Sequence, residues 1–409
     1  MRHLDITTVC ATALLAVSLP AAADTVTDWN RRADGFITES KLGTPPAIRV
    51  MALVQTAVHD ALAGLPAPAA RSPAAIDAAV AAAHRATLGK LLPAQQAAVD
   101  AAATAALAAI VDGPAKAAGV DAGTRAAQAV LAARAADAPG PDQYRPQAAP
   151  GTYVPTAMPA ASTWAQRTPW LMTHAAQWRP GAPPSLASER WSRDVAEVKA
   201  LGAKAGGARS AEQTAIARFW EYSLPAIYHG VVRSQADQPG RDTLSNARLF
   251  AAVAQAMDDA MVAVFDAKYH HHFWRPVTAI RNGDVDGHPA TERDAGWSPL
   301  VDTPMHPEYP SAHSVLAAAV GTVLEAEFGA APAQPLATSS PTAQGATRRW
   351  PRIDDFVREV SDARIYGGLH FRFSTEAGEA LGRQVGRLAV DRVWRGGASV
   401  HADTGTAPR

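Results

Sequence analysis

A proline, a hydroxyl, a small residue and an imidazole stand together where a helix is expected to begin. The segment is Tyr-Pro-Ser-Ala-His at residues 309–313, and apolar residues recur at helical spacing after it. A helix start offers backbone N–H groups without intrahelical partners and a partial positive charge, which favour an oxyanion. Ser311 could cap the helix or donate its hydroxyl to the anion. His313 would face the core, where a lone histidine is usually structural.

Two further segments add cations and a second histidine. Lys268 and Arg275 are seven residues apart, which is two helical turns, so both could project to one side of a helix. On these residues alone, two solvated cations beside an aromatic patch would be the ordinary interpretation. Arg364 and His370 lie about 120° apart on an ideal helix, so they converge only if the backbone bends. Gly367-Gly368 supplies a place for that bend.

The three segments together solve one chemical problem. A lysine and two arginines neutralise a multiply charged oxyanion, and guanidinium groups do so through their fork geometry. A serine hydroxyl and free helix N–H groups add hydrogen bonds. One histidine can then attack or coordinate the central atom of the anion, while the other transfers a proton.

These residues resemble a known signature. They are similar in order and spacing to a motif of three parts. The parts are Lys268 followed after six residues by Arg275-Pro276, the Pro-Ser-Ala-His run at 310–313, and Arg364 followed after five residues by His370. Vanadium-dependent haloperoxidases, type-2 phosphatidic acid phosphatases and bacterial acid phosphatases share this motif. The motif covers about residues 265–375, and the earlier helices resemble the bacterial haloperoxidase-like branch less specifically. The resemblance implies an all-α fold of the haloperoxidase and acid phosphatase type, with the site in a helical bundle.

The resemblance also implies a role for each position. His370 would be the vanadium ligand, or the phosphohistidine nucleophile in a phosphatase, and His313 would be the acid–base residue. The oxygens of vanadate or phosphate would be bound by three cations, a hydroxyl and a backbone N–H, supplied by Lys268, Arg275, Arg364, Ser311 and Ala312.

The chain departs from the family pattern at two positions. Ala312 stands where the family usually has glycine, so a Cβ narrows the approach to the anion. Ser374 stands where phosphatases usually place an aspartate four residues after the nucleophilic histidine, and a hydroxyl is a weaker, uncharged partner.

Two residues could line a halide pocket. His306 precedes His313 by seven residues, as in bromide-oxidising relatives, and Phe265 occupies a position where relatives often carry tryptophan. For His306 the equal alternative is an ordinary loop histidine between prolines.

We therefore expect a vanadium-dependent haloperoxidase-like enzyme that oxidises bromide or iodide with hydrogen peroxide. Vanadate would be held by His370, Lys268 would polarise the peroxide, and His313 would assist proton transfer. The alternative is an acid phosphatase that needs no cofactor, because phosphate and vanadate share shape and charge. A non-catalytic phosphate-binding protein would not need the two histidines. The expected partners are small molecules, namely peroxide with a halide or a phosphate ester, and a homodimer is left open.

Other clusters in the chain are poor metal sites. The histidines at 270–272 look like a metal cluster, but consecutive residues of a helix point about 100° apart and cannot chelate one ion well. Residues 282–287 mimic the start of a calcium loop, but Arg293 occupies the position of its bidentate glutamate.

The elements that must position the site are helices. Thr44-Pro45-Pro46 and Gly64 predict the start and end of one helix, and Ser72-Pro73 begins a second. Pro93 begins a third that runs towards Asp-Gly-Pro at 112–114, and a fourth is expected over about 121–136. Residues 138–185 are rich in proline but also contain tryptophans, which predicts a long ordered loop around the helical body.

Further helix starts follow that loop. Ser188 begins one helix, the pair Ser210 and Gln213 forms a capping box for the next, and a long helix begins near Asp242. The apolar stripe of this long helix ends at Lys268. A lysine there either extends to water or meets an anion inside.

Composition and targeting signals complete the prediction. The 409 residues have a formal net charge of zero, which gives no indication of a nucleic-acid or acidic-membrane partner. Residues 1–23 are typical of a secretory signal, so we expect an exported protein, periplasmic or secreted, without a transmembrane segment. Cys10, the single cysteine, would leave with that signal. We expect an N-terminal helical region over 24–187, a C-terminal bundle carrying the site over 188–400, and a flexible tail over 401–409.

Overall fold

The protein is all-α, as the sequence predicts. The computed structural model describes residues 24–137, 140–155 and 157–394, so the predicted secretory signal at 1–23 and the tail at 401–409 lie outside the described residues. Within the described ranges the chain forms thirteen α-helices and one hairpin of two short strands. The sequence analysis did not predict that hairpin.

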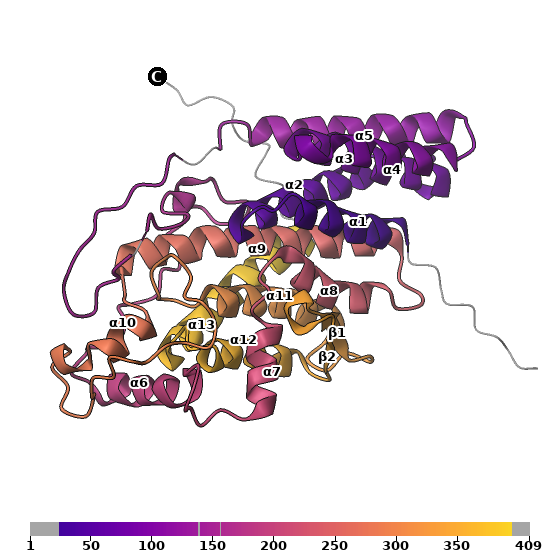
Figure 1. The fold of residues 1–409 in the computed structure, drawn as a ribbon. Helices are drawn as coiled ribbons and strands as arrows, with labels where there is room; N and C mark the ends of the chain where they lie inside the picture. Colours follow the sequence, from indigo (N-terminus) through magenta and orange to yellow (C-terminus); the bar gives the residue numbers. More distant parts are fainter. Residues whose placement is uncertain (1–23, 138–139, 156, 395–409) are drawn as a thin grey trace, which may run out of the picture.

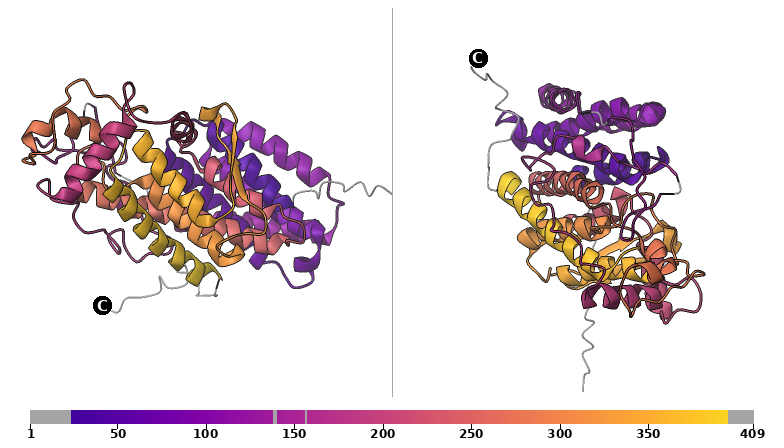
Figure 2. Two further views of the ribbon diagram at one scale, coloured as in Figure 1. Left: turned by 90° about the horizontal axis from the view of Figure 1, so that it is seen from below. Right: turned by 90° about the vertical axis from the view of Figure 1, so that its left-hand side faces the viewer.

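The helices stack in layers on either side of the long helix α9 (Figure 1). Helix α9 spans Thr243–His271. On one side lie α1 and α2, with three alanine-rich helices beyond them; the bounds are α1 Thr25–Glu39, α2 Thr44–Ala63, α3 Pro73–Leu91, α4 Gln96–Ala108 and α5 Pro114–Ala133. On the other side lie α11 Ala312–Phe328, α12 Ile353–Tyr366 and α13 Arg372–Ala389. The views of Figure 2 show the same layers from two other directions.

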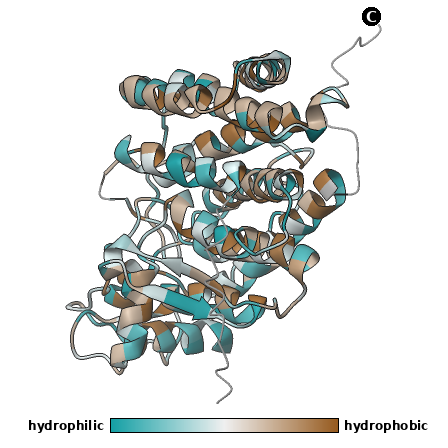
Figure 3. Cartoon of the chain, turned by 90° about the vertical axis from the view of Figure 1, so that its right-hand side faces the viewer, coloured by the Kyte–Doolittle hydropathy of each residue, from teal (hydrophilic) through white to brown (hydrophobic). Residues whose placement is uncertain are grey.

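Shorter elements surround the second of these layers. They are α6 Glu189–Gly202, α7 Ala211–Phe219, α8 Pro225–Ala236 and α10 Pro276–Arg281, with strands β1 Leu336–Ser339 and β2 Thr347–Trp350. The strands pair antiparallel, with Leu336 opposite Trp350. In Figure 3 the alanine-rich helices are mainly brown, whereas the edge of the molecule near the hairpin carries more teal. Among the described helices, none combines the length and apolarity needed to cross a bilayer.

Most predicted helix starts are confirmed by their caps. Ser210 and Gln213 form both hydrogen bonds of the capping box, the Asp242 carboxylate accepts from the Ser245 N–H, and Ser188 caps α6. The predicted start of α5 was wrong: Pro114 is its first residue, seven positions before the expected start. Asp-Gly-Pro at 112–114 begins this helix rather than ending the previous one, because proline suits a first helical position.

The irregular segment after α5 is anchored to α9. The backbone N–H groups of Trp170, Leu171 and Met172 all donate to the buried Asp259 carboxylate on α9. Burial raises the pKa of Asp259 to about 7, even though these three bonds oppose the shift. Nearer the site, the Ala160 N–H donates to the Met305 carbonyl oxygen at 2.7 Å. The loop therefore reaches from the N-terminal helices to the C-terminal bundle.

The two predicted regions share one core. The largest buried cluster includes Val54 and Val58 of α2, Met257 of α9, and Leu316 and Val320 of α11. The division of the chain near residue 188 is not tested by this packing, and it stays a prediction.

Glycines bring α13 unusually close to α11. A Cβ added at Gly378 would lie 2.7 Å from the Ser311 carbonyl oxygen, and one at Gly382 would lie 2.2 Å from that of Val315. Gly386, one turn further on, meets the α11 backbone and Thr322 in the same way. Side chains at these positions would push the helices apart, so the glycines set the distance between the start of α11 and the start of α13.

A matched pair of substitutions tests this contact. Gly382→Ala should lower the free energy of unfolding by about 1–3 kcal/mol, because a buried methyl would overlap the α11 backbone. Gly35→Ala, at an exposed position of α1 where an added Cβ meets nothing within 4 Å, should raise it by roughly 0.5–1 kcal/mol through helix propensity. Urea unfolding followed by circular dichroism measures both values. Equal effects of the two changes would contradict the close packing of α11 and α13.

A candidate oxyanion site in the C-terminal bundle

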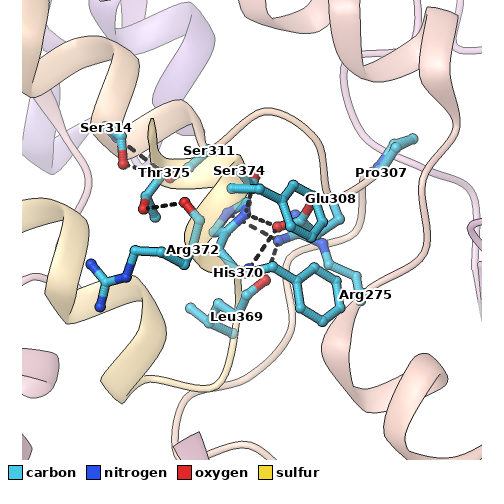
Figure 4. A network of polar contacts seen from close by, with 12 residues as sticks. Arg275, Pro307, Glu308, Ser311, Ser314, Leu369, His370, Arg372, Ser374 and Thr375 are labelled. Carbon is cyan, nitrogen blue, oxygen red and sulfur yellow. Dashed lines mark hydrogen bonds and ion pairs between the residues drawn. The ribbon is translucent and has the colours of Figure 1, made fainter. Parts of the chain in front are cut away.

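The three sequence segments converge on one buried cluster at helix ends. Five of the residues predicted to bind the oxyanion are at most 3% exposed. They come from five elements: Lys268 from the last turn of α9, Arg275 from the N-cap of α10, Ser311 from the N-cap of α11, Arg364 from the last turn of α12, and His370 from the turn before α13. Figure 4 shows part of this cluster. The Gly367-Gly368 bend that the sequence required is present, with Gly368 at a φ of +77°.

Lys268 is fixed by two backbone carbonyls. Its Nζ donates to the carbonyl oxygens of Pro307 at 3.0 Å and Glu308 at 2.8 Å. An ammonium group has three protons, so one remains for a ligand. Burial lowers the pKa of Lys268 well below its usual value, and the neighbouring Arg275 lowers it further.

Arg275 joins the loop before α11 to the turn before α13. Its guanidinium donates to the His306 carbonyl oxygen and Nδ1, to the Leu369 carbonyl oxygen at 3.0 Å, and to Nε2 of His370 at 3.1 Å. These four bonds hold the side chain rigidly across the site. Burial lowers the pKa of Arg275 to about 10.

Arg364 and His313 meet at the end of α7. The Arg364 Nη1 donates to the Trp220 carbonyl oxygen at 2.9 Å, and the His313 ring also hydrogen-bonds the Trp220 backbone. Arg364 Nε and His313 Nε2 are buried polar atoms that find no partner in the described part of the chain. A ligand between them would satisfy both atoms.

A row of hydroxyl groups leads to Ser311. The Ser361 hydroxyl donates to that of Ser314 at 3.0 Å, and the Ser314 hydroxyl donates to that of Ser311 at 3.0 Å. The predicted N-cap is present, since Ser311 Oγ also accepts from the Ser314 N–H. Because Ser311 is the acceptor in both bonds, its own proton is left for an anion at the start of α11.

His370 is held between a cation and a carboxylate that the sequence analysis missed. Its Nε2 faces Arg275, and its Nδ1 lies 2.7 Å from Oε1 of Glu308. Glu308 is fully buried, and burial raises its pKa to about 7 against the opposing charges of Arg275 and Lys268. Ser374, at the position where phosphatases usually place an aspartate, is a more distant partner, with Oγ 3.4 Å from Nδ1.

The charge balance of the cluster fits a bound oxyanion. Three buried cations, Lys268, Arg275 and Arg364, line the cluster. The buried Glu308 carboxylate lies near Lys268 and Arg275. The part-exposed Glu221 lies near Arg364, but none of the three cations forms an ion pair within the described residues. Burial lowers the pKa of Lys268 and both arginines, since uncompensated charge is costly away from water. A tetrahedral anion such as vanadate or phosphate would neutralise the excess and satisfy Arg364 Nε. The donor set therefore fits the group that the resemblance implies.

A pocket of about 690 Å³ opens onto this cluster. Its floor carries His313, Arg364 and His370, together with Ala312. Its walls come from the start of α2, from the loop with Trp164, from α9, and from the segment before α11. Phe265 and His306 both line it, and their rings pack edge to face with centroids 5.3 Å apart. The pair predicted for a halide pocket is thus brought together beside the candidate oxyanion site.

The structure also tests the weaker candidates and exposes what was overlooked. The histidines at 270–272 have separate partners, such as Arg179 for His270 and the Pro180 carbonyl oxygen for His271. No group of three metal-ligating side chains occurs among the described residues. Glu308 and Trp220 were overlooked. Glu308 lies within the range 265–375 that the motif covers, but it is 62 residues from His370 in the sequence, so local spacing does not indicate their contact. Trp220 contacts Arg364 and His313 through its backbone. Any residue type could make such a contact, so it cannot be predicted from the amino acid at that position.

Part of the chain matches a known family of helical bundles. Residues 248–396 match the family model of the VCPO second helical-bundle domain. The resemblance to the vanadium haloperoxidases is thereby confirmed. A vanadium chloroperoxidase from Curvularia inaequalis is 32% identical over 138 residues, which cover 27% of this chain but only 22% of that protein.

Two solved structures share the vanadium haloperoxidase fold over most of the chain. A bacterial vanadium-dependent iodoperoxidase has a TM-score of 0.74 and 21% identity, covering 90% of this chain and 96% of its own. A holo-type bacterial vanadium-dependent chloroperoxidase has a TM-score of 0.72 and 19% identity, covering 87% and 93%. At this identity the likeness concerns the fold.

Anion binding should stabilise the protein through the cation cluster. At a phosphate concentration of about 100 times Kd, the free energy of unfolding should increase by about 2.7 kcal/mol. Scanning calorimetry would detect this increase as a rise in Tm. Arg364→Met should remove most of that rise, because Arg364 has an unpartnered Nε at the site. Arg31→Met, at an exposed arginine of α1, should keep it. An equal phosphate effect in both variants would contradict the site.

Proposed function

We propose that this protein is a vanadium-dependent haloperoxidase that oxidises bromide or iodide with hydrogen peroxide. The observation that carries the proposal is the buried excess of positive charge around His370, open to a pocket that also contains Phe265 and His306. In the overall reaction, bromide, hydrogen peroxide and a proton give hypobromous acid and water. Bromide loses two electrons, and the peroxide bond is reduced.

The chain's own residues would divide the work. Lys268, Arg275 and Arg364 would hold vanadate by charge, with hydrogen bonds from the Ser311 hydroxyl and the first N–H groups of α11. His370 would be the ligand through Nε2. Bound vanadate supplies the Lewis-acid centre at which hydrogen peroxide is activated towards halide.

His313 would move the protons of the reaction. Burial, reinforced by Arg364 and Lys268, lowers its pKa well below the usual value, so its ring is neutral and can accept a proton. Its Nε2 finds no partner within the described ranges and lines the pocket. Lys268 has one proton left over from its two carbonyl bonds, which suits a role in polarising peroxide.

The pocket suggests an apolar organic acceptor for the oxidised halogen. Trp164, Met261, Phe265 and Leu316 contribute to its walls. The pocket also includes the Asp142 carboxylate, but this group already accepts hydrogen bonds from the Ser162 N–H and hydroxyl. Its volume lies within the range of small-molecule sites.

An acid phosphatase remains the second candidate, and one observation favours it. The sequence analysis counted the lack of an aspartate at position 374 against phosphatase chemistry. The Glu308 carboxylate at 2.7 Å from His370 Nδ1 supplies a charged partner from elsewhere. His370 would then attack phosphorus through Nε2, and His313 would protonate the leaving alkoxide.

One paired assay separates the two activities. The purified protein, stripped of metal and anions, is titrated with orthovanadate, and bromide oxidation with peroxide is measured beside hydrolysis of an aryl phosphate. We expect saturable, vanadate-dependent bromide oxidation. Rapid phosphate release without vanadate, together with no halide oxidation, would reject the haloperoxidase in favour of the phosphatase.

Histidine variants assign that activity to the site. His370→Ala should abolish whichever activity is present, because the central atom loses its ligand or nucleophile. His59→Ala, at a partly exposed histidine on α2 beside Asp60, should retain it. Full activity in His370→Ala would remove the basis of both candidate functions.

A further inference from the structure

Glu308 contacts both His370 and the backbone beside it. The Oε1 atom lies 2.7 Å from His370 Nδ1 and accepts from the Phe371 N–H at 3.1 Å. Figure 4 shows the glutamate side chain pointing to the turn that carries His370. Both side chains are buried, so this bond is shielded from water.

The contacts of His370 determine which ring nitrogen carries the proton. A guanidinium group has donors only, so Nε2 of His370, which faces Arg275 Nη1 at 3.1 Å, must be the acceptor. In a neutral imidazole the other nitrogen then carries the proton. The Nδ1–H is therefore donated to Glu308, and the lone pair of Nε2 points towards Arg275 and the anion site.

The position of Glu308 is itself fixed by the cations of the site. Its carbonyl oxygen and that of Pro307 accept from Lys268 Nζ, and the carbonyl oxygen of His306 accepts from Arg275 Nε. Three residues later Ser311 caps the start of α11, and its N–H donates to the Ser374 carbonyl oxygen. The segment 306–308 thus binds Lys268 and Arg275 through its carbonyl oxygens and orients His370 through the Glu308 side chain.

We propose that Glu308 is the positioning residue of the site, which fixes the His370 tautomer and aims Nε2 at the bound oxyanion. This inference rests on the proposed function, because it concerns the nitrogen that would hold vanadate or attack phosphate. Ser374 cannot do the same with its hydroxyl, which is uncharged and lies 3.4 Å from Nδ1. A carboxylate at position 374, one helical turn after His370, would reach the same nitrogen.

The test relocates the carboxylate within the full-length protein. Glu308→Gln keeps the size of the side chain but removes its charge, and should weaken vanadate binding, measured by calorimetry, by about 10–100-fold. The double variant Glu308→Gln with Ser374→Asp should recover most of that affinity. Glu327→Gln, at a carboxylate of α11 paired with Arg241 at 2.8 Å, should leave vanadate affinity unchanged.

The outcomes are distinct. Unchanged vanadate affinity in Glu308→Gln, or an equal loss in the single and double variants, would overturn the proposal. Inorganic phosphate binding is measured in parallel. Phosphate binding that is lost in Glu308→Gln and recovered in the double variant would support the positioning role. This result would hold even if the vanadate-loaded protein oxidised no halide. Failure of the proposed function can therefore be distinguished from failure of the positioning role.

A second measurement covers a Glu308→Gln variant that does not fold. Nuclear magnetic resonance of the wild-type protein with isotope-labelled histidine, with His370 assigned by its loss in His370→Ala, reports the tautomer directly. We expect the proton on Nδ1 and none on Nε2. A proton on Nε2 in the anion-free protein would overturn the proposal.

Discussion

Burial of positive charge without matching negative charge is the constraint on which the rest of this structure depends. Lys268, Arg275 and Arg364 are all withdrawn from water, and Glu308 is a buried carboxylate near Lys268 and Arg275. Each cation is held by backbone carbonyls rather than by its own ion pair. Such an arrangement lowers the folding stability of the anion-free protein, and binding of an anion would offset this loss.

The helical architecture meets this constraint by bringing helix ends together. Polar side chains and unpaired backbone groups concentrate at helix ends, and five such ends supply the site. The glycines of α13 let α11 approach closely, which places the Ser311 end of α11 beside the turn carrying His370. The loop after α5 and the start of α2 then close the pocket from the N-terminal side. The pocket thus includes residues from both the N-terminal and the C-terminal helices, although the proposed anion-binding groups lie in the C-terminal bundle.

Local signals allowed much of this to be predicted from sequence. The caps at Ser210 and Asp242 and the apolar stripe ending at Lys268 depend on short-range spacing. The cations and histidines were found because the motif fixes residue type and order. Glu308 was missed because nothing in its own sequence context shows that it meets His370. The α5 start was misjudged because Asp-Gly-Pro is compatible with both a helix end and a helix beginning.

The central claim is that an oxyanion binds at Nε2 of His370 inside the cation cluster. A crystal structure of the protein soaked in orthovanadate tests it most directly. We predict vanadium at bonding distance from Nε2, with its oxygens contacting Lys268, Arg275, Arg364 and the Ser311 hydroxyl. Vanadium bound elsewhere, or a site that stays free of vanadate at saturating concentration with His370 still bonded to Arg275, would contradict the account.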